Sequence, residues 1–256
     1  MNRIESIEQS FFDKDVLNTE YLLRYRRTYY QQLQDGWQLA FKNYESILDC
    51  LISIFENNNQ YGKSYCSRIK SEPENMRSCE AIMSEAFVHN YYIPLKNENL
   101  IKSIELIEKE CDLIIEENSN SKRYYEILTL MPDIGFDGVY EIKTQRQKEP
   151  SSLRQKILEK IRGRKQFTKN RKNIAAIDLN DISITGNFHV LSSLSNGYKA
   201  KINLETGVLV PGEYDWSDNI FDDELTKYIY AVEWFDRGDY SQRRSLINWN
   251  YKGNDK

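Results

Sequence analysis

Residues 131–145 have the sequence MPDIGFDGVYEIKTQ, and this stretch decides our prediction of the fold. The segment VYEIKT, residues 139–144, is typical of a strand, in which residues two apart share a face. We therefore expect Glu141 and Lys143 to point the same way while Ile142 points into the core. A carboxylate and an ammonium group are presented together.

The turn before this strand decides whether Asp133 joins the pair. A two-residue turn at Asp137-Gly138 would send Asp133 to the other face. A three-residue turn ending at Gly138, with that glycine in a left-handed conformation, would pair Asp133 with Glu141 on one face. In the second arrangement, which Gly138 suits, two carboxylates and a lysine form a hard-oxygen site for Mg²⁺.

The segments around this stretch alternate between helix and strand patterns. Upstream we predict a helix over SCEAIMSEAFVHNYYI (78–93), capped by Ser78, and another helix over NENLIKSIELIEKE (97–110). CDLII (111–115) and RYYEILTLM (123–131) are then expected to form a hairpin. Downstream, a helix should begin near Ser151, and the continuous apolar run NIAAIDL (173–179) predicts a central parallel strand.

The ends of the chain have less distinct patterns. Apolar residues at three- and four-residue spacings predict helices over residues 20–33 and 37–55. Beyond Asp181 we expect short strands at FHVLSSL (188–194) and within 198–210, and a helix around residues 222–235. The predicted organisation is a helical region over 1–77, a core over 78–181 and a mixed extension over 182–256. The expected class is α/β with a mixed sheet.

Composition excludes several classes of protein. The 256 residues include only 11 Gly and 5 Pro, which are too few for a turn-rich all-β protein. No apolar run approaches the roughly 18 residues of a membrane helix, and the charged start is unlike a signal peptide, so we expect a cytoplasmic protein without membrane contact. The four cysteines lack metal-site spacing and should be free buried thiols. The GKS at residues 62–64 lacks the other residues of a phosphate loop.

The net charge of −4 conceals a strong asymmetry along the chain. Residues 142–172 hold twelve basic residues against two acidic ones, and residues 203–241 hold ten acidic residues against two basic ones. The twelve are Lys143, Arg146, Lys148, Arg154, Lys156, Lys160, Arg162, Arg164, Lys165, Lys169, Arg171 and Lys172. The basic segment 142–172 is suited to binding a polyanion, so we expect nucleic acid as the partner.

The order of elements, together with Pro132-Asp133 and the EIKT of residues 141–144, resembles the PD-(D/E)XK nuclease superfamily, which includes many restriction endonucleases. The resemblance covers residues 78–179. It implies a restriction-endonuclease-like αβββαβ core and Mg²⁺-dependent hydrolysis of phosphodiester bonds. Asp133 and Glu141 would be metal ligands, Lys143 would align the attacking water, and Glu85 would assist from the leading helix.

Some features leave alternatives open. The spacing from Asp133 to Glu141 is shorter than usual for the family, and Asp112 is the competing first metal ligand. A pair of Asp112 with Glu126 would have Leu128 where the lysine belongs. His89 stands four residues after Glu85, a spacing that could share a metal, although a lone histidine is more often a packed residue. Gln166 resembles a glutamine that some members place near the site.

The leading prediction is a metal-dependent endonuclease, a hydrolase acting on DNA rather than RNA, in the manner of type II restriction enzymes. Its length would suit a homodimer on duplex DNA. A second hypothesis is a nucleic-acid-binding protein of the same fold without catalysis. A third is a helical protein-interaction partner with a regulatory or immunity role.

Overall fold

A computed structural model describes residues 3–34, 42–107, 111–129, 150–163, 167–179, 186–236 and 243–253. The fold is mixed α/β, and the chain divides into two compact units, residues 1–107 with 112–120 and residues 108–111 with 121–256. Among the described residues, no helix is both long and apolar enough to cross a bilayer.

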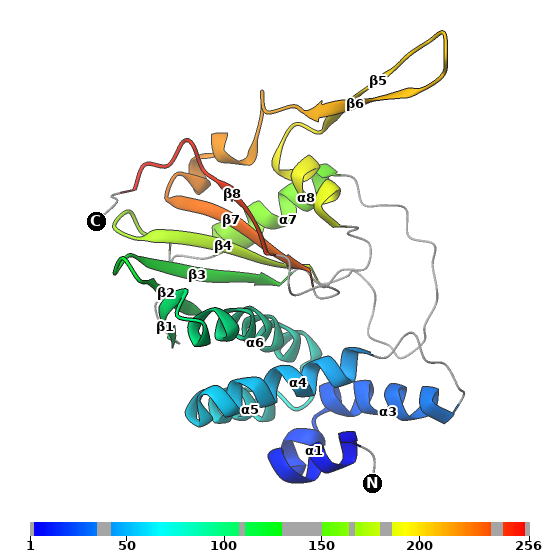
Figure 1. Ribbon diagram of the computed structural model, residues 1–256, viewed down its shortest axis with the longest axis vertical. Coiled ribbons are helices and arrows are strands. Elements are labelled where there is room, and N and C mark those ends of the chain that lie inside the picture. The colour runs from blue at the N-terminus through cyan, green and yellow to red at the C-terminus, as the bar shows by residue number, and fades with distance from the viewer. Residues whose placement is uncertain are drawn as a thin grey trace. The chain divides into compact units, whose positions relative to one another are not determined.

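The first unit is mainly helical (Figure 1). Its described helices are α1 (Arg3–Phe11), α2 (Lys14–Leu17), α3 (Glu20–Gln34), α4 (Lys42–Asn57), α5 (Asn59–Ser71) and α6 (Met76–Asn97). Its strands, β1 (Ile101–Leu106) and β2 (Leu113–Glu117), pair antiparallel. Helix α4 packs against both α5 and α6, and β1 follows and contacts α6.

Helix α6 is the most buried helix of this unit. The sequence predicted its existence, but it begins after Asn75, whose Oδ1 accepts a hydrogen bond from the Ser78 amide at 3.1 Å. It also runs through Pro94, where the helix was expected to stop, and ends before Asn99, which has a φ of 57°. Its buried residues lie on most sides and include Glu80, Glu85 and His89. Helix α6 is therefore covered on more than one face.

The second unit holds four strands of a mixed sheet, with helices over one face of these strands (Figure 1). Strands β3 (Lys122–Thr129), β4 (Lys172–Leu179) and β7 (Ile229–Asp236) are parallel, and β8 (Arg243–Ile247) is antiparallel to β7. Its helices are α7 (Pro150–Gly163), α8 (Gly186–Leu194) and the short η1 (Ile220–Asp222) and η2 (Glu224–Thr226). A separate hairpin joins β5 (Tyr198–Ile202) to β6 (Leu209–Tyr214).

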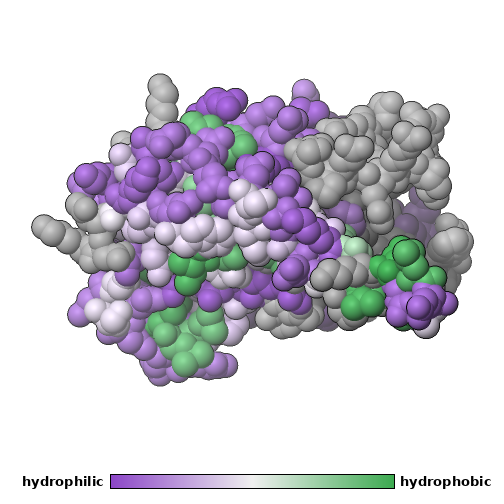
Figure 2. Space-filling model, turned by 90° about the horizontal axis from the view of Figure 1, so that it is seen from above, coloured by the Kyte–Doolittle hydropathy of each residue, from purple (hydrophilic) through white to green (hydrophobic). Residues whose placement is uncertain are grey.

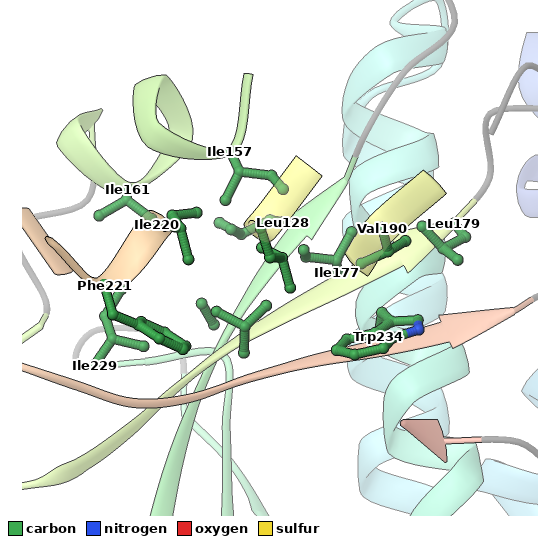
Figure 3. Close-up of a cluster of buried hydrophobic side chains, with 13 residues drawn as sticks. Leu128, Ile157, Ile161, Ile177, Leu179, Val190, Ile220, Phe221, Ile229 and Trp234 are labelled. Atoms are coloured by element: carbon green, nitrogen blue, oxygen red, sulfur yellow. The ribbon is translucent and has the colours of Figure 1, made fainter. Parts of the chain in front are cut away.

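The core of this unit lies between the sheet and its two helices. Ile157 and Ile161 of α7 pack over Leu128 of β3 and Ile177 of β4, with Val190 of α8 beside them (Figure 3). The prediction that residues 173–179 form a buried parallel strand is confirmed, because Asn173 and the six residues after it are all buried between β3 and β7.

Three secondary-structure predictions are wrong, and pairing with a neighbouring strand explains two of them. Ile101–Leu106 was expected to be helical but pairs with β2 as β1. Ile229–Asp236 was also expected in a helix but is β7, rich in β-branched and aromatic residues that suit a central strand. Residues 188–194, expected as a strand, are helical in α8, where Val190 and Leu194, one turn apart, are both fully buried.

Other predictions are confirmed. The strands β2, β3 and β5 and the helix α7 lie in or next to the segments where we expected them, whereas β6 begins at the end of the predicted segment 198–210 and continues beyond it. The four cysteines are free and buried. The described surface in Figure 2 is mostly hydrophilic, although four exposed large apolar residues, Ile202, Leu204, Val208 and Val210, lie together on the hairpin of β5 and β6.

Gly62 lies inside α5, so the GKS sequence is helical and is not a phosphate loop. A Cβ atom at Gly62 would overlap the ring of Phe55 on α4. The close approach of these two helices therefore requires glycine at this position.

We predict that Gly62→Ala destabilises the protein by about 1–3 kcal/mol through overpacking, despite the better helix propensity of alanine. Chemical denaturation measures the free energy of unfolding. Gly163→Ala is the control, because a Cβ there meets nothing within 4 Å. In a Phe55→Leu background, Gly62→Ala should reduce the free energy of unfolding by less. An equal reduction in both backgrounds would show that overlap with the Phe55 ring is not its cause.

Candidate functional site

The predicted centre of catalysis lies outside the described residues. Asp133, Glu141 and Lys143, together with the predicted strand 139–144, fall within residues 130–149, and Gln166 falls within 164–166. The remaining predicted site residues, Glu85 and Asp112, are described.

Glu85 is buried on α6 and is engaged by an arginine. Arg68 of α5 donates from Nη1 to Glu85 Oε2 at 2.5 Å, and Glu85 is 8% exposed. Burial opposes the charge of Arg68. The hydrogen bond that Arg68 donates to Glu85, together with the negative charges of Glu85 and Asp112, more than offsets this, so the pKa of Arg68 is raised. This carboxylate is bound to a guanidinium group.

Asp112, just before β2, lies in the same electrostatic neighbourhood. Its charge acts on Arg68 and on Tyr65, whose pKa is raised mainly by complete burial and then by Glu85. The guanidinium of Arg68 also lies 5.7 Å from the centre of the Tyr65 ring. The structure thus brings the two predicted acidic residues into one neighbourhood around Arg68.

His89 is a packed residue of this cluster. It is 1% exposed, its Nδ1 lies 3.3 Å from the Tyr65 hydroxyl, and its ring meets the edge of Tyr61. Desolvation lowers the pKa of His89 to about 4. In the part of the chain that the structure describes, no three His, Cys, Asp or Glu side chains are grouped to hold a metal ion. The cluster of Tyr65, Arg68, Glu85, His89 and Asp112 therefore fits a structural ion-pair network better than a metal site.

A second buried carboxylate lies on the sheet of the second unit. Glu233 of β7 is 1% exposed and accepts a hydrogen bond from the Tyr125 hydroxyl at 3.1 Å. Its Oε1 lies 3.6 Å from Arg123 Nη1 and 3.5 Å from Arg243 Nη1. These side chains come from β3, β7 and β8, so one carboxylate links three strands. Sequence reasoning missed this cluster, because residues 222–235 were expected to form a helix and no local pattern indicates which strands pair.

The basic helix predicted as a nucleic-acid surface is α7, and its charges have different surroundings. Arg154 donates to Asp218 Oδ1 and to the Asn219 carbonyl, both at 2.9 Å, which ties α7 to the acidic segment. Lys160 and Arg162 are exposed near the C-terminal end. The buried face of the helix holds Ile157 and Ile161. Lys160 and Arg162 are thus exposed to solvent, whereas Arg154 is engaged by the acidic segment.

Comparison with known proteins found no family model, no curated protein and no solved structure that matches this chain.

The burial of His89 predicts a pH dependence of stability. The pKa is about 4 in the folded protein and about 6.5 in the unfolded chain, so the unfolded chain binds the extra proton between these values. Stability should be highest above about pH 6.5 and fall by about 2–3 kcal/mol on acidification to pH 4 from this residue alone. Urea denaturation at several pH values measures it. His89→Gln should have a shallower acid slope, whereas an unchanged slope would contradict the assignment.

The Glu233 cluster predicts a strong effect of removing one charge. Glu233→Gln leaves two arginines beside a neutral group and should destabilise the protein by on the order of 3 kcal/mol. The matched control is Glu224→Gln, whose exposed pairs with Lys227 and Lys252 should contribute less than about 1 kcal/mol. Thermal unfolding measures both variants. An equal loss of stability in Glu233→Gln and Glu224→Gln would show that the burial of Glu233 does not matter.

Proposed function

We propose that this protein is a Mg²⁺-dependent nuclease with a restriction-endonuclease-like core, acting on DNA. The single observation that supports this most is the order of elements from α6 to β4. Among the described residues, one helix, three strands, a second helix and a fourth strand follow one another, and β4 is parallel to β3. That order is like the αβββαβ order of the superfamily that the sequence resembles, with β3 as its third strand. The resemblance itself takes residues 139–144 as the third strand, and these lie outside the described residues.

The hydrolytic residues of the proposal are Asp133, Glu141 and Lys143. Bound Mg²⁺ would supply charge stabilisation at the phosphate and lower the pKa of a water molecule. Asp133 and Glu141 would hold the ion through carboxylate oxygens, with Lys143 orienting the water. Asp112 and Glu85 are less suited to this work, since both lie near the cation of Arg68.

The second candidate is a protein that binds nucleic acid without cleaving it. Three strands, β1, β2 and β3, precede α7 in the described residues, so β3 with Glu126 could occupy the position of the third core strand. In that alignment Leu128 replaces the lysine, and it is fully buried in the core against α7. An active site built on Asp112 and Glu126 would then lack its cation, which favours binding alone.

Cleavage assays separate these candidates. Purified protein is incubated with supercoiled plasmid, linear duplex DNA and a structured RNA, with Mg²⁺ or with chelator. We expect Mg²⁺-dependent cleavage of DNA that falls on the order of 100-fold or more in Lys143→Ala and Glu141→Gln, by analogy with removal of one group that stabilises a transition state. The control Lys63→Ala changes an exposed lysine on α5 and should cleave normally.

Full activity of Lys143→Ala would contradict the assignment of the catalytic residues. Salt-dependent binding without cleavage of any substrate would favour the second candidate. Absence of both binding and cleavage would leave the helical protein-interaction role as the better proposal.

A further inference from the structure

Tyrosine rings and basic groups gather where the parallel strands of the second unit begin. Tyr124 is near the start of β3, Arg171 and Lys172 are at the start of β4, and Tyr230 is near the start of β7. Because β3, β4 and β7 run in the same direction, their amino-terminal ends lie at one edge of the sheet (Figure 1). Tyr251, beyond β8, completes what we call the tyrosine–cation cluster.

The members of this cluster contact one another in a chain. The Arg171 guanidinium lies 4.8 Å from the centre of the Tyr124 ring, and the Lys172 ammonium lies 5.4 Å from that of Tyr230. Tyr251 donates its hydroxyl proton to the Arg171 carbonyl at 2.9 Å and meets the Tyr230 ring edge to face, with centroids 5.4 Å apart. All five side chains are half-buried, so each is held in place and still presents surface to a ligand.

A buried asparagine fixes the backbone beneath the cluster. Asn173 is 2% exposed, and its Nδ2 donates to the Thr168 carbonyl at 2.7 Å and to the Tyr228 carbonyl at 2.8 Å. These bonds tie the segment before β4 to the segment before β7. The rings and cations are therefore preorganised, which reduces the entropy lost when a ligand binds.

A pocket of about 390 Å³ adjoins the cluster at Tyr251 and includes Trp249, which is 53% exposed. Its lysines, Lys227 and Lys252, both contact Glu224, at 3.0 and 3.6 Å. Two further carboxylates line it, those of Asp222 and Asp223. The three carboxylates of this aromatic pocket outnumber its two lysines, so the pocket is suited to a neutral base and unsuited to a phosphate.

We propose that the tyrosine–cation cluster and this pocket bind single-stranded nucleic acid. Unpaired bases would stack on the tyrosine rings and enter the pocket beside Trp249, while phosphates would meet Arg171, Lys172 and the exposed Lys169. Duplex DNA keeps its base faces stacked inside the helix and could use only the cations. This inference rests on the proposed nucleic-acid substrate and names its form at this edge of the sheet.

The test is fluorescence anisotropy of a labelled 15-nucleotide oligothymidylate and of a duplex of equal length, with chelator present so that cleavage cannot interfere. We expect tighter binding of the single strand. Tyr230→Leu, which removes a ring, should weaken it about 5- to 10-fold, as loss of one stacking contact does. Arg171→Gln should weaken it and reduce the slope of log K against log salt by about 0.7.

Matched controls separate loss of the ligand contact from loss of folding. Tyr230→Phe keeps the ring, and Arg77→Gln removes an exposed guanidinium of the first unit, so both should bind as the parent does. Thermal unfolding of Tyr230→Leu and Arg171→Gln establishes that both are folded at the assay temperature.

Equal affinity for duplex and single strand, or unchanged affinity in folded Tyr230→Leu and Arg171→Gln, would overturn the inference. Failure of the proposed nuclease activity has a different signature. In that case the single strand would bind and respond to both variants, while no substrate would be cleaved with Mg²⁺.

Discussion

Both units depend on ion pairs between a buried glutamate and arginine, and the described part of the structure contains three such glutamates. Glu8 of α1 binds Arg26 of α3 through two hydrogen bonds of 2.8 Å and accepts another from Tyr44 of α4 at 2.7 Å. Glu85 is held by Arg68, and Glu233 lies among Tyr125, Arg123 and Arg243. A carboxylate removed from water is costly unless its charge and lone pairs are satisfied, so each glutamate admits one arrangement of the elements around it.

This constraint also limits where chemistry can occur. The helix position that the resemblance gives to a catalytic acid is occupied by Glu85, and Arg68 neutralises it while also lying near Asp112. A divalent cation would have to compete with that guanidinium group. We therefore propose that hydrolysis is carried out by Asp133, Glu141 and Lys143. In the same proposal, the exposed cations of α7 and the tyrosine–cation cluster recognise the substrate.

The sequence predicted those elements whose own pattern is decisive. Residues 173–179 are apolar throughout and became β4, and the helical pattern before Pro94 became α6. It failed where pairing with another strand decides the outcome, since the Glu- and Lys-containing Ile101–Leu106 pairs with β2 as a strand. The candidate site was less predictable than the fold. The resemblance indicated Glu85 as an acid on a helix, but nothing local indicated that Arg68 would bind it, or that Tyr124, Tyr230 and Tyr251 would meet at one edge of a sheet.

Metal binding tests the central claim most directly, because it needs no substrate. Isothermal titration of Mn²⁺, as a probe for Mg²⁺, into the parent protein, Glu141→Gln and Glu126→Gln compares the two positions for the acids. Our account predicts binding by the parent and by Glu126→Gln, with a large loss of affinity in Glu141→Gln. Unchanged binding in Glu141→Gln, or loss in Glu126→Gln alone, would contradict it.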